Sequence, residues 1–406
     1  MTFGRLFATA VPTQPSFTTM YTGQTSITHG IISHKGDVEL AERAPWLPSI
    51  LRLAGMTTSA FCCLPRYKHW FIRGFEFVVD STSRYEDQGY TAEVLNSRAL
   101  PWLREHADER FFMVVHYWDP HTPYLPPDRF RTFYDGDPTD PALPDTLAPL
   151  RKQYFSVMWD PWFHKLPYQG IRDAEYIVSL YDGEVRHCDE AVGELLAALH
   201  ESGHFEDTLV LLTSDHGELF YRHDVFFDHH GLYDGNIRCP LIVGLPGVTK
   251  PGSRAGEFAQ HHDIAPTLLE VLDLDVPGAM EGLSLVPALD GRGGPMREFV
   301  VSEECTWQKK WAIRTESEKL IVGLGPDLHQ RPPRELYDLA ADPDELHNVA
   351  DSQPARADTL QKRLEAWIAE LVARNGLAGD PLVAADITLG KKWEEWLAEG
   401  NGRITS

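Results

Sequence analysis

The stretch Leu209–Glu218, with the sequence LVLLTSDHGE, gives the clearest indication of the fold. Its first four residues are apolar, and a polar turn follows them directly. A short apolar run that ends in a polar turn is typical of a buried strand in an α/β sheet. Ligands of such sheets bind just beyond the carboxyl ends of the strands. Because Asp215 and His216 stand at that position, the stretch predicts a functional turn at a strand end.

This turn has two interpretations on its sequence alone. A carboxylate beside an imidazole is a natural pair of metal ligands, so Asp215 and His216 could hold a divalent ion. Asp and Gly are also ordinary turn residues, and the turn could merely cap the strand. The rest of the chain has to decide between these interpretations.

Strands and helices alternate along the chain up to about residue 292. The strongest helix prediction covers residues 172–202, where apolar residues recur at intervals of three and four. Further strands are expected at 57–61, 111–116 and 240–243, and further helices at 38–54, 97–106 and 263–272, the last with Asp263 as N-cap. This alternation predicts an α/β fold with a doubly wound, mostly parallel sheet and helices on both faces.

The sequence pattern changes after about residue 292. Short antiparallel strands are expected at 297–303, 310–315 and 319–322, and a helix at 355–375. We therefore expect an α/β domain over residues 1–292, a small α+β subdomain over 293–380 and a tail over 381–406. Residues 126–170 are rich in Pro, Asp and aromatic residues, which predicts a long loop region.

The composition excludes some classes of function. A net charge of −23 over 406 residues argues against a nucleic-acid-binding protein. An anionic substrate stays open, because a bound metal ion can reverse the local field in a cleft. No apolar run is long enough to cross a membrane. Five cysteines without a recognisable spacing indicate a reducing compartment, so we expect a cytoplasmic protein, and a homo-oligomeric state stays open.

Two loops carry histidines near the ends of predicted strands. His121 follows the strand predicted at 111–116, and the prolines on both sides restrict its backbone. A rigid histidine at this edge suits substrate contact or proton donation, with a structural loop histidine as the alternative. His229 and His230 precede the next predicted strand, where one could bind an anionic group, although a His-His pair is also a common surface feature.

The N-terminal segment 11–23 is rich in hydroxyl groups and is bounded by prolines. A threonine at a helix N-terminus is placed to bind an anion together with backbone N–H groups. If Thr13 also contacts a metal ion, its alkoxide becomes a feasible nucleophile. Simple N-capping by Thr13 or Ser16 is the alternative.

Together and in this order, these blocks resemble the sulfatases of the alkaline phosphatase superfamily over nearly the whole chain. The matching blocks are Thr13–Phe17 with Thr22-Gly23, Asp119–Tyr124, Thr213–Glu218, Tyr233–Ile242, Asp263–Leu269 and Glu335–Leu339. Each block is short, but the ordered set is specific. The resemblance implies an alkaline-phosphatase-like fold and a hydrolase that acts on a small anionic ester of sulfate, phosphate or phosphonate.

The resemblance also implies roles for single residues. A divalent metal ion would be held by Asp215 and His216. His121 and either His229 or His230 would contact the anionic group or assist the leaving group, and ungapped counting places His229 where the family usually has a lysine. The imidazole ligand favours Mn, Zn or Fe over Ca, whereas family usage keeps Ca and Mg open.

One departure from the family pattern concerns the nucleophile. Thr13 stands where sulfatases have a Cys or Ser that is converted to formylglycine, and a threonine cannot become that aldehyde because its β-carbon carries a methyl group. The arginine that usually follows in the signature is Phe17 here. Threonine is the nucleophile of related phosphodiesterases and phosphomutases, so a phosphoester substrate becomes as plausible as a sulfate ester, and a mutase or transferase is a weaker option.

A second departure concerns the metal site. The family normally opens with a strand that ends in two adjacent aspartates, but here the first acidic residue is Asp37, after Thr13. We expect either an N-terminal truncation, which we favour, or a lost site in a catalytically silent member that acts in binding. A missing central strand would expose sheet edges and apolar surface.

Overall fold

The computed structural model describes residues 1–80, 91–152, 162–293, 296–325, 327 and 329–388. These residues form two compact units. The first contains residues 1–47, 209–219 and those from 229 onward, and the second contains 48–208 and 220–228. The domain boundary expected at 292 divides the chain differently and stays a prediction. The predicted loop at 126–170 lies partly outside the described residues, and the predicted tail lies mostly outside them.

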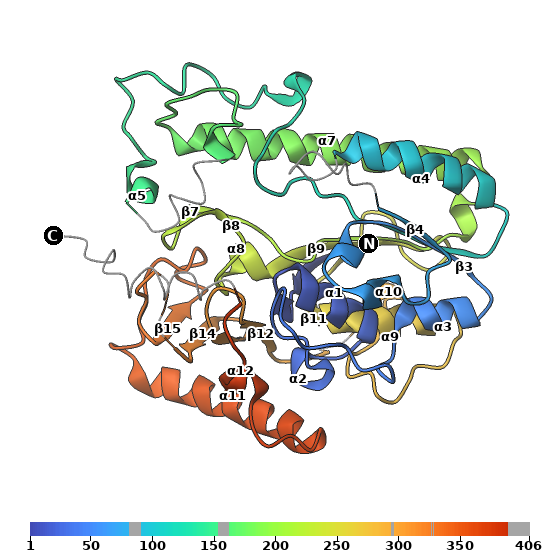
Figure 1. Ribbon diagram of the computed structural model, residues 1–406. Coiled ribbons are helices and arrows are strands. Elements are labelled where there is room, and N and C mark those ends of the chain that lie inside the picture. The colour runs from blue at the N-terminus through green and yellow to red at the C-terminus, as the bar shows by residue number, and fades with distance from the viewer. Residues whose placement is uncertain (81–90, 153–161, 294–295, 326, 328, 389–406) are drawn as a thin grey trace. The chain divides into compact units, whose positions relative to one another are not determined.

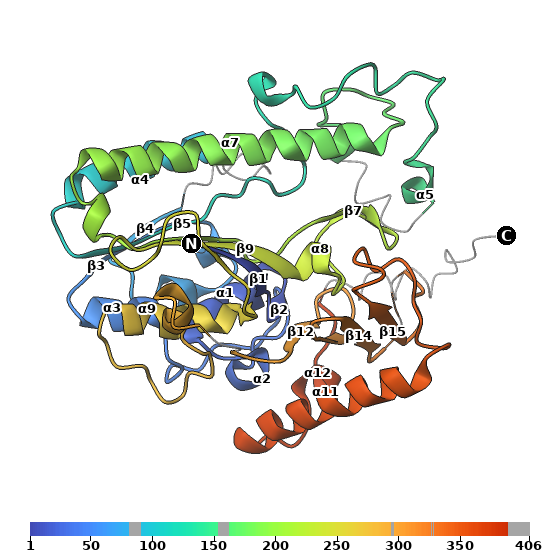
Figure 2. The ribbon, with the colours of Figure 1, turned by 180° about the vertical axis from the view of Figure 1, so that it is seen from behind.

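A mixed sheet in the first unit carries the LVLLTSDHGE stretch. Its strands follow the order β10 (Arg254–Ala255), β1 (Thr2–Phe7), β9 (Arg238–Gly244) and β6 (Val210–Thr213), and β11 (Ala259–Gln260) also pairs with β1. β1 runs parallel to β10 and β11, whereas β9 runs antiparallel to both β1 and β6. Helices α1 (Thr13–Thr22) and α9 (Ile264–Val271) pack against each other below this sheet (Figures 1 and 2).

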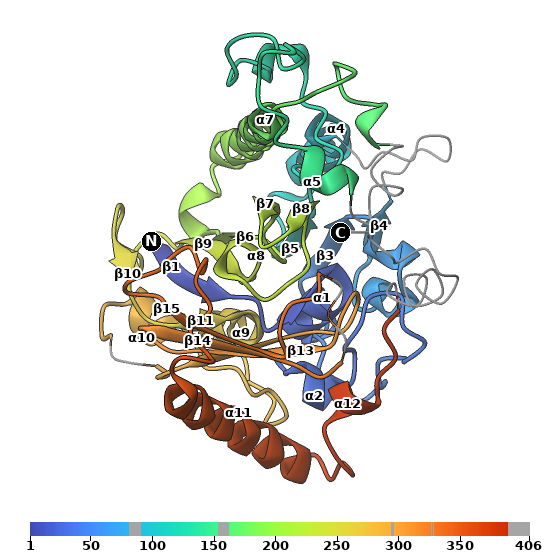
Figure 3. The same ribbon diagram turned by 90° about the vertical axis from the view of Figure 1, so that its left-hand side faces the viewer.

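A second sheet of the first unit is an antiparallel meander. Its strands are β15 (Arg334–Asp338), β14 (Glu318–Gly323), β13 (Lys310–Arg314) and β12 (Val300–Glu304). β2 (Ala10–Val11) extends it in parallel to β12, which fixes the chain directly before α1. Helix α11 (Pro354–Arg374) lies along one face through buried leucines (Figure 3). The strands and the helix predicted for this region are therefore confirmed to within a few residues.

The second unit is built on a parallel sheet and two helices. The strands are β4 (Phe77–Val79), β3 (Thr57–Phe61) and β5 (Phe111–Val115), in that order. Helices α4 (Ala92–His106) and α7 (Ala174–Glu201) lie side by side in every view (Figures 1 to 3). The helix predicted over 172–202 is confirmed as α7, and Gly203 follows it with a φ of 83°.

Short elements complete the chain. A hairpin pairs β7 (Leu219–Arg222) with β8 (Val225–Asp228). The short helices and 3-10 turns are α2 (Ser26–His29), α3 (Leu47–Leu53), η1 (Leu64–Arg66), η2 (His69–Ile72), η3 (Asp128–Phe130), α5 (Ala148–Arg151), η4 (Phe205–Asp207), α8 (Asp234–Ile237), η5 (His261–Asp263), α10 (Val286–Leu289) and α12 (Pro381–Ala384). None of the described helices is long and apolar enough to cross a membrane.

One local prediction is corrected, and a second is confirmed with different bonding. The helix expected over 38–54 is confined to Leu47–Leu53, because Pro45 and Pro48 restrict the backbone around its start. Asp263 is the N-cap residue of α9, as predicted, but its side chain makes no capping bond to that helix. Its carboxylate accepts from the backbone N of Gln260 instead, as part of the capping box of η5.

Two strands with apolar sequences, β5 and β6, lie at the edges of their sheets. Among the described residues, β6 pairs with β9 alone and β5 pairs with β3 alone. Every residue of both strands is partly exposed, although such strands are normally covered on both faces. The missing strand and the truncation expected from the sequence stay predictions.

A buried ion cluster ties the antiparallel sheet to α8. Lys319 is fully buried, and its Nζ lies 2.5 Å from Asp234 Oδ1 and 2.6 Å from Glu345 Oε1. Burial opposes ionisation of Asp234, but Lys319 and Arg314 hold its pKa down at about 2. Because this pKa is depressed, the contribution of Asp234 to stability is present above its ordinary pKa of 3.8 and is lost as the pH falls towards 2.

Replacing Lys319 should therefore destabilise the fold. Lys319→Met leaves Glu345 buried without its cation, and we expect a loss of about 3–5 kcal/mol in the free energy of unfolding, measured by urea titration. Lys362→Met, at an exposed position on α11, is the matched control and should change stability by less than about 0.5 kcal/mol. Equal effects from the two substitutions would contradict a stabilising role of the cluster.

Candidate active site

Thr13 begins α1 and faces the Asp-His-Gly turn. The N-cap is Pro12, without a side-chain capping bond, so the alternative in which Thr13 or Ser16 caps the helix is wrong. Thr13 is buried, and its Oγ1 lies 3.4 Å from Nε2 of His216. The first hydroxyl of the helix is therefore directed at the imidazole that follows β6.

The proton of His216 is located by its neighbours. Nδ1 lies 2.9 Å from the backbone oxygen of Gly217, and a carbonyl oxygen can only accept, so Nδ1 carries the hydrogen. In the neutral ring, Nε2 then presents its lone pair to the Thr13 hydroxyl. The carboxylate of Asp215 lies on the same side, with Oδ2 3.5 Å from Nε2 of His216. Nε2 of His216 thus lies close both to Thr13, the candidate nucleophile, and to the carboxylate of Asp215, the second candidate metal ligand.

Ser16 supports the turn from the next turn of α1. Its hydroxyl donates to the backbone oxygen of Asp215 at 2.7 Å and lies 3.0 Å from Nδ1 of His261. Since the hydroxyl hydrogen is used on Asp215, the Ser16 oxygen accepts from His261. Burial lowers the pKa of His261 to about 4, so this ring is neutral at physiological pH. His261 therefore fixes the hydroxyl of Ser16, and that hydroxyl holds the Asp-His-Gly turn in place.

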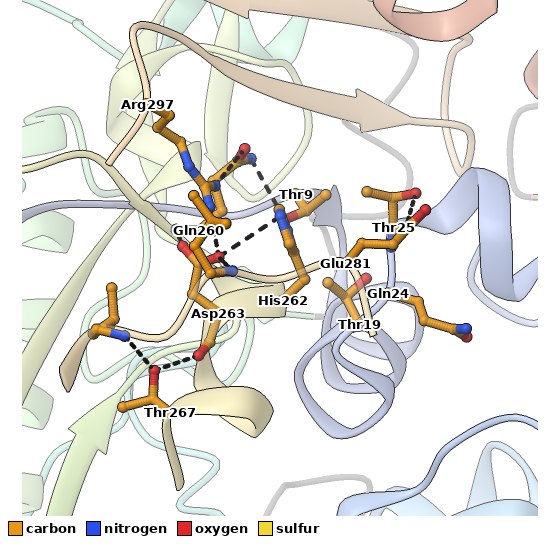
Figure 4. Close-up of polar contacts among 12 residues, drawn as sticks. Thr9, Thr19, Gln24, Thr25, Gln260, His262, Asp263, Thr267, Glu281 and Arg297 are labelled. Carbon is orange, nitrogen blue, oxygen red and sulfur yellow. Dashed lines mark hydrogen bonds and ion pairs between the residues drawn. The ribbon is translucent and has the colours of Figure 1, made fainter. Parts of the chain in front are cut away.

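His261 was not among the predicted site residues. The block Asp263–Leu269 was interpreted as a helix start and as one of the family blocks, although two histidines directly precede it. Figure 4 shows how the second of them, His262, is held: its Nδ1 lies 3.0 Å from Thr9 Oγ1. Arg297 donates to Asp263 Oδ1 at 2.6 Å in the same network. These bonds fix η5 and hence the position of His261.

The Asp-His-Gly turn is pressed against the backbone of α8. Gly217 N donates to Asn236 O at 2.6 Å, and Glu218 N donates to Gly235 O at 3.2 Å. A Cβ at position 217 would overlap the oxygen of Gly235. Glycine is required here by close backbone approach rather than by an unusual φ.

The two histidines at 229 and 230 have different surroundings. The ring of His229 stacks on His216, with centroids 4.4 Å apart and an interplanar angle of 18°. His230 is buried, and its Nε2 lies 2.7 Å from Nε2 of His329. The structure thus brings His229 onto the ring of His216 and directs His230 towards the antiparallel sheet. This supports the preference for His229, whose role stays a prediction.

His121 belongs to the second unit and lies in the loop after β5. Its Nδ1 lies 2.7 Å from the backbone oxygen of Thr122, so Nδ1 donates, and the neutral ring carries its lone pair on Nε2. The ring stacks on Trp118 at a centroid distance of 4.3 Å. The orientation of the His121 ring is therefore set by contacts with Thr122 and Trp118 in its own loop.

The described residues provide part of a metal site. Asp215 and His216 offer an oxygen and a nitrogen donor on one side of the turn, which suits a divalent ion. No group of three His, Cys, Asp or Glu side chains in the described ranges is arranged to hold a metal ion. Metal sites in proteins usually need about four to six ligands. An ion here would need ligands beyond the described residues.

Sequence comparison connects this geometry with a family. The family model described as Sulfatase matches residues 1–274. The chain belongs to the sulfatase family. A second model, described as N-sulphoglucosamine sulphohydrolase, C-terminal, matches residues 222–374. The two models together cover the Asp-His-Gly turn and the antiparallel sheet.

Individual relatives agree with this assignment. The chain is 27% identical over 289 residues to an arylsulfatase of Clostridium perfringens, an alignment that covers 69% of this chain and 58% of the relative. It is 28% identical over 323 residues to the multifunctional alkaline phosphatase superfamily protein PehA of Trinickia caryophylli, over 71% of this chain and 61% of that protein. The chain thus spans about three-fifths of the length of these curated relatives.

A solved structure confirms the fold class. The phosphonate monoester hydrolase of Silicibacter pomeroyi superposes with a TM-score of 0.74 at 21% identity, over 92% of this chain and 88% of that chain. The sulfatase chain therefore has the α/β fold of the alkaline-phosphatase type that its sequence predicted.

The close approach at Gly217 can be tested directly. Gly217→Ala must push the turn away from α8, and we expect a loss of about 1–3 kcal/mol in unfolding free energy, measured by urea titration. Gly193→Ala is the control, because its Cβ meets nothing within 4 Å and helix propensity should add about 0.5–1 kcal/mol. A Gly217→Ala protein as stable as the parent would refute the packing argument.

Proposed function

We propose that this sulfatase-family protein hydrolyses sulfate, phosphate or phosphonate esters, with Thr13 as the nucleophile. The observation that carries the proposal is the 3.4 Å approach of Thr13 Oγ1 to Nε2 of His216. The arylsulfatase and the phosphonate monoester hydrolase among the similar proteins support this substrate class. The alternative of a catalytically silent binding protein is not favoured, because the candidate nucleophile and base already face each other.

The proposed reaction uses residues of the first unit. The hydroxyl of Thr13 loses its proton towards Nε2 of His216, whose tautomer is fixed by Gly217, while Oγ1 attacks the sulfur or phosphorus atom. The bond from that atom to the ester oxygen breaks, the alcohol leaves with a proton, and a covalent ester remains on Thr13. Water then hydrolyses this ester. His229, stacked on His216, is proposed to contact the anionic group, and leaving-group assistance by His121 stays an expectation from the family resemblance.

The proposal includes a divalent ion at Asp215 and His216, completed by ligands beyond the described residues. Such an ion supplies positive charge that favours the alkoxide and neutralises the anionic ester. Nε2 of His216 can hold either the Thr13 proton or the ion, so the two versions of the proposal differ in their metal requirement. We also propose a cytoplasmic location, which the five free cysteines support.

The nucleophile assignment can be tested with chromogenic substrates. Thr13→Ala removes the attacking oxygen and should lower turnover by about a thousandfold or more, whereas Thr13→Ser keeps a hydroxyl and should retain measurable turnover. The assay compares sulfate esters, phosphate mono- and diesters and phosphonate esters, each with Mn, Zn, Ca or Mg and after chelation. Both the chain as printed and a form extended at its N-terminus are assayed.

Matched variants separate chemistry from folding. Thr359→Ala, at an exposed position on α11, should leave turnover unchanged. Asp215→Ala should abolish any metal-dependent part of the turnover. Undiminished turnover by Thr13→Ala, or no turnover of any ester by either form with any of the ions, would overturn the proposal.

A further inference from the structure

The loop that carries His121 is anchored to α7 by a buried carboxyl group. We propose that Glu184 is a positioning residue for His121, because its side chain binds this loop on both sides of the histidine. The kinetic consequences rest on the function proposed above, whereas the consequences for the His121 ring do not.

Glu184 makes two contacts with the loop. Its Oε1 accepts a hydrogen bond from the backbone N of Leu125 at 2.6 Å. Its carboxyl group also lies next to the carboxyl of Asp119, close enough for the two to interact and to share a hydrogen bond. Asp119 precedes His121 by two residues, and Leu125 follows it by four. A single side chain of α7 therefore bridges the segment in which His121 lies.

Two carboxyl groups can share a hydrogen bond only when one of them is protonated. Glu184 is 5% exposed, and the side chain of Asp119 is 8% exposed. Burial, together with the neighbouring charge of Asp119, raises the pKa of Glu184 to about 9. At neutral pH, Glu184 therefore donates to Asp119 with its hydroxyl oxygen and accepts from Leu125 with the other oxygen.

Other titratable side chains surround this pair of carboxyl groups. Nδ1 of His187, on the same helix, lies 3.9 Å from Asp119 Oδ1. Burial raises the pKa of Asp119 above its ordinary value, and the nearby His187 acts in the opposite direction. Nε2 of His187 lies 3.9 Å from Glu93 on α4. Burial raises the pKa of Cys188 to about 12 and also raises that of Tyr117, so both stay neutral. Glu184, whose pKa is raised to about 9, is thus the protonated carboxyl of the pair at neutral pH.

Apolar contacts press the same loop onto α7. Tyr124 is 1% exposed, and its ring packs edge-on against Tyr181 at a centroid distance of 5.2 Å. A Cβ on Gly183 would lie 2.6 Å from the backbone oxygen of Phe130, so helix and loop meet at backbone distance. With the loop held this closely, loss of the Glu184 bonds should reorient His121 rather than release the whole segment.

The kinetic test compares two substitutions of Glu184. Glu184→Gln keeps a donor for Asp119 and an acceptor for Leu125 without a titrating proton, and it should retain the parent kcat at pH 7. Glu184→Met removes both bonds and should lower kcat by about ten- to a hundredfold with little change in KM, because His121 is misplaced. Glu201→Gln, at an exposed position on α7, is the matched control and should change neither constant.

The pH profile gives a second readout. Above about pH 9, Glu184 ionises beside Asp119, and the two like charges repel each other. The parent should therefore lose kcat as the pH rises through this value, whereas Glu184→Gln should keep its kcat there. Because the folded pKa lies above the ordinary 4.5, the stabilisation linked to this proton is complete below pH 4.5 and is lost as the pH rises towards 9.

An imidazole ¹⁵N spectrum tests the positioning without any turnover. The His121 signals, assigned by their loss in His121→Asn, should shift or broaden in Glu184→Met at pH 7 and in the parent above pH 9, but not in Glu184→Gln. Unchanged His121 signals in a folded Glu184→Met protein would overturn the positioning role. If Glu184→Met does not fold, identical alkaline responses of the parent and Glu184→Gln would overturn it instead.

The spectrum also separates this role from the proposed function. If no ester is turned over but the His121 signals respond as expected, the positioning role stands and the proposed hydrolase fails. If turnover occurs and His121 does not respond, the hydrolase stands and the positioning role fails.

Discussion

The geometry of the site depends on the approach of two backbones, that of the turn after β6 and that of α8. Gly217 and Glu218 donate to the oxygens of Asn236 and Gly235, and there is no room for a side chain on Gly217. This contact fixes the position of the turn relative to the end of β6. From there, the side chain of His216 can reach Thr13 at the start of α1, because that start is fixed separately by the pairing of β2 with β12.

The candidate histidines are oriented by the chain next to them. His216 donates to the oxygen of Gly217, and His121 donates to the oxygen of Thr122, so in each neutral ring the lone pair is on Nε2. This arrangement needs no distant partner to select the tautomer. Distant residues instead fix the backbone that carries the ring: Ser16 with His261 for the first histidine, and Glu184 for the second.

Periodicity and turn chemistry predicted much of this fold. The apolar stripe of α7 and the apolar run of β6 predicted a helix and a strand that the structure contains. Such predictions succeed because burial of one helix face or of a whole strand leaves a local pattern in the sequence. The direction of β9, antiparallel to its neighbours, leaves no such pattern. His261 was missed for a related reason: its contact with Ser16 joins residues 245 positions apart, and neither residue is unusual in its local sequence. Likewise, nothing local shows that His230 faces His329 while His229 faces the turn.

The carboxyl group of Glu184 anchors the His121 loop, but its burial lowers the free energy of unfolding above the ordinary pKa of a glutamate. Transfer of a carboxyl from water to a buried position favours its neutral form, and the free energy of unfolding falls with each pH unit between the ordinary pKa of 4.5 and the folded value of about 9. An apolar residue at this position would avoid that cost. It could not, however, donate to Asp119 and accept from Leu125 at once. The buried acid is therefore better explained by the two bonds it makes to the His121 loop than by a contribution to the core.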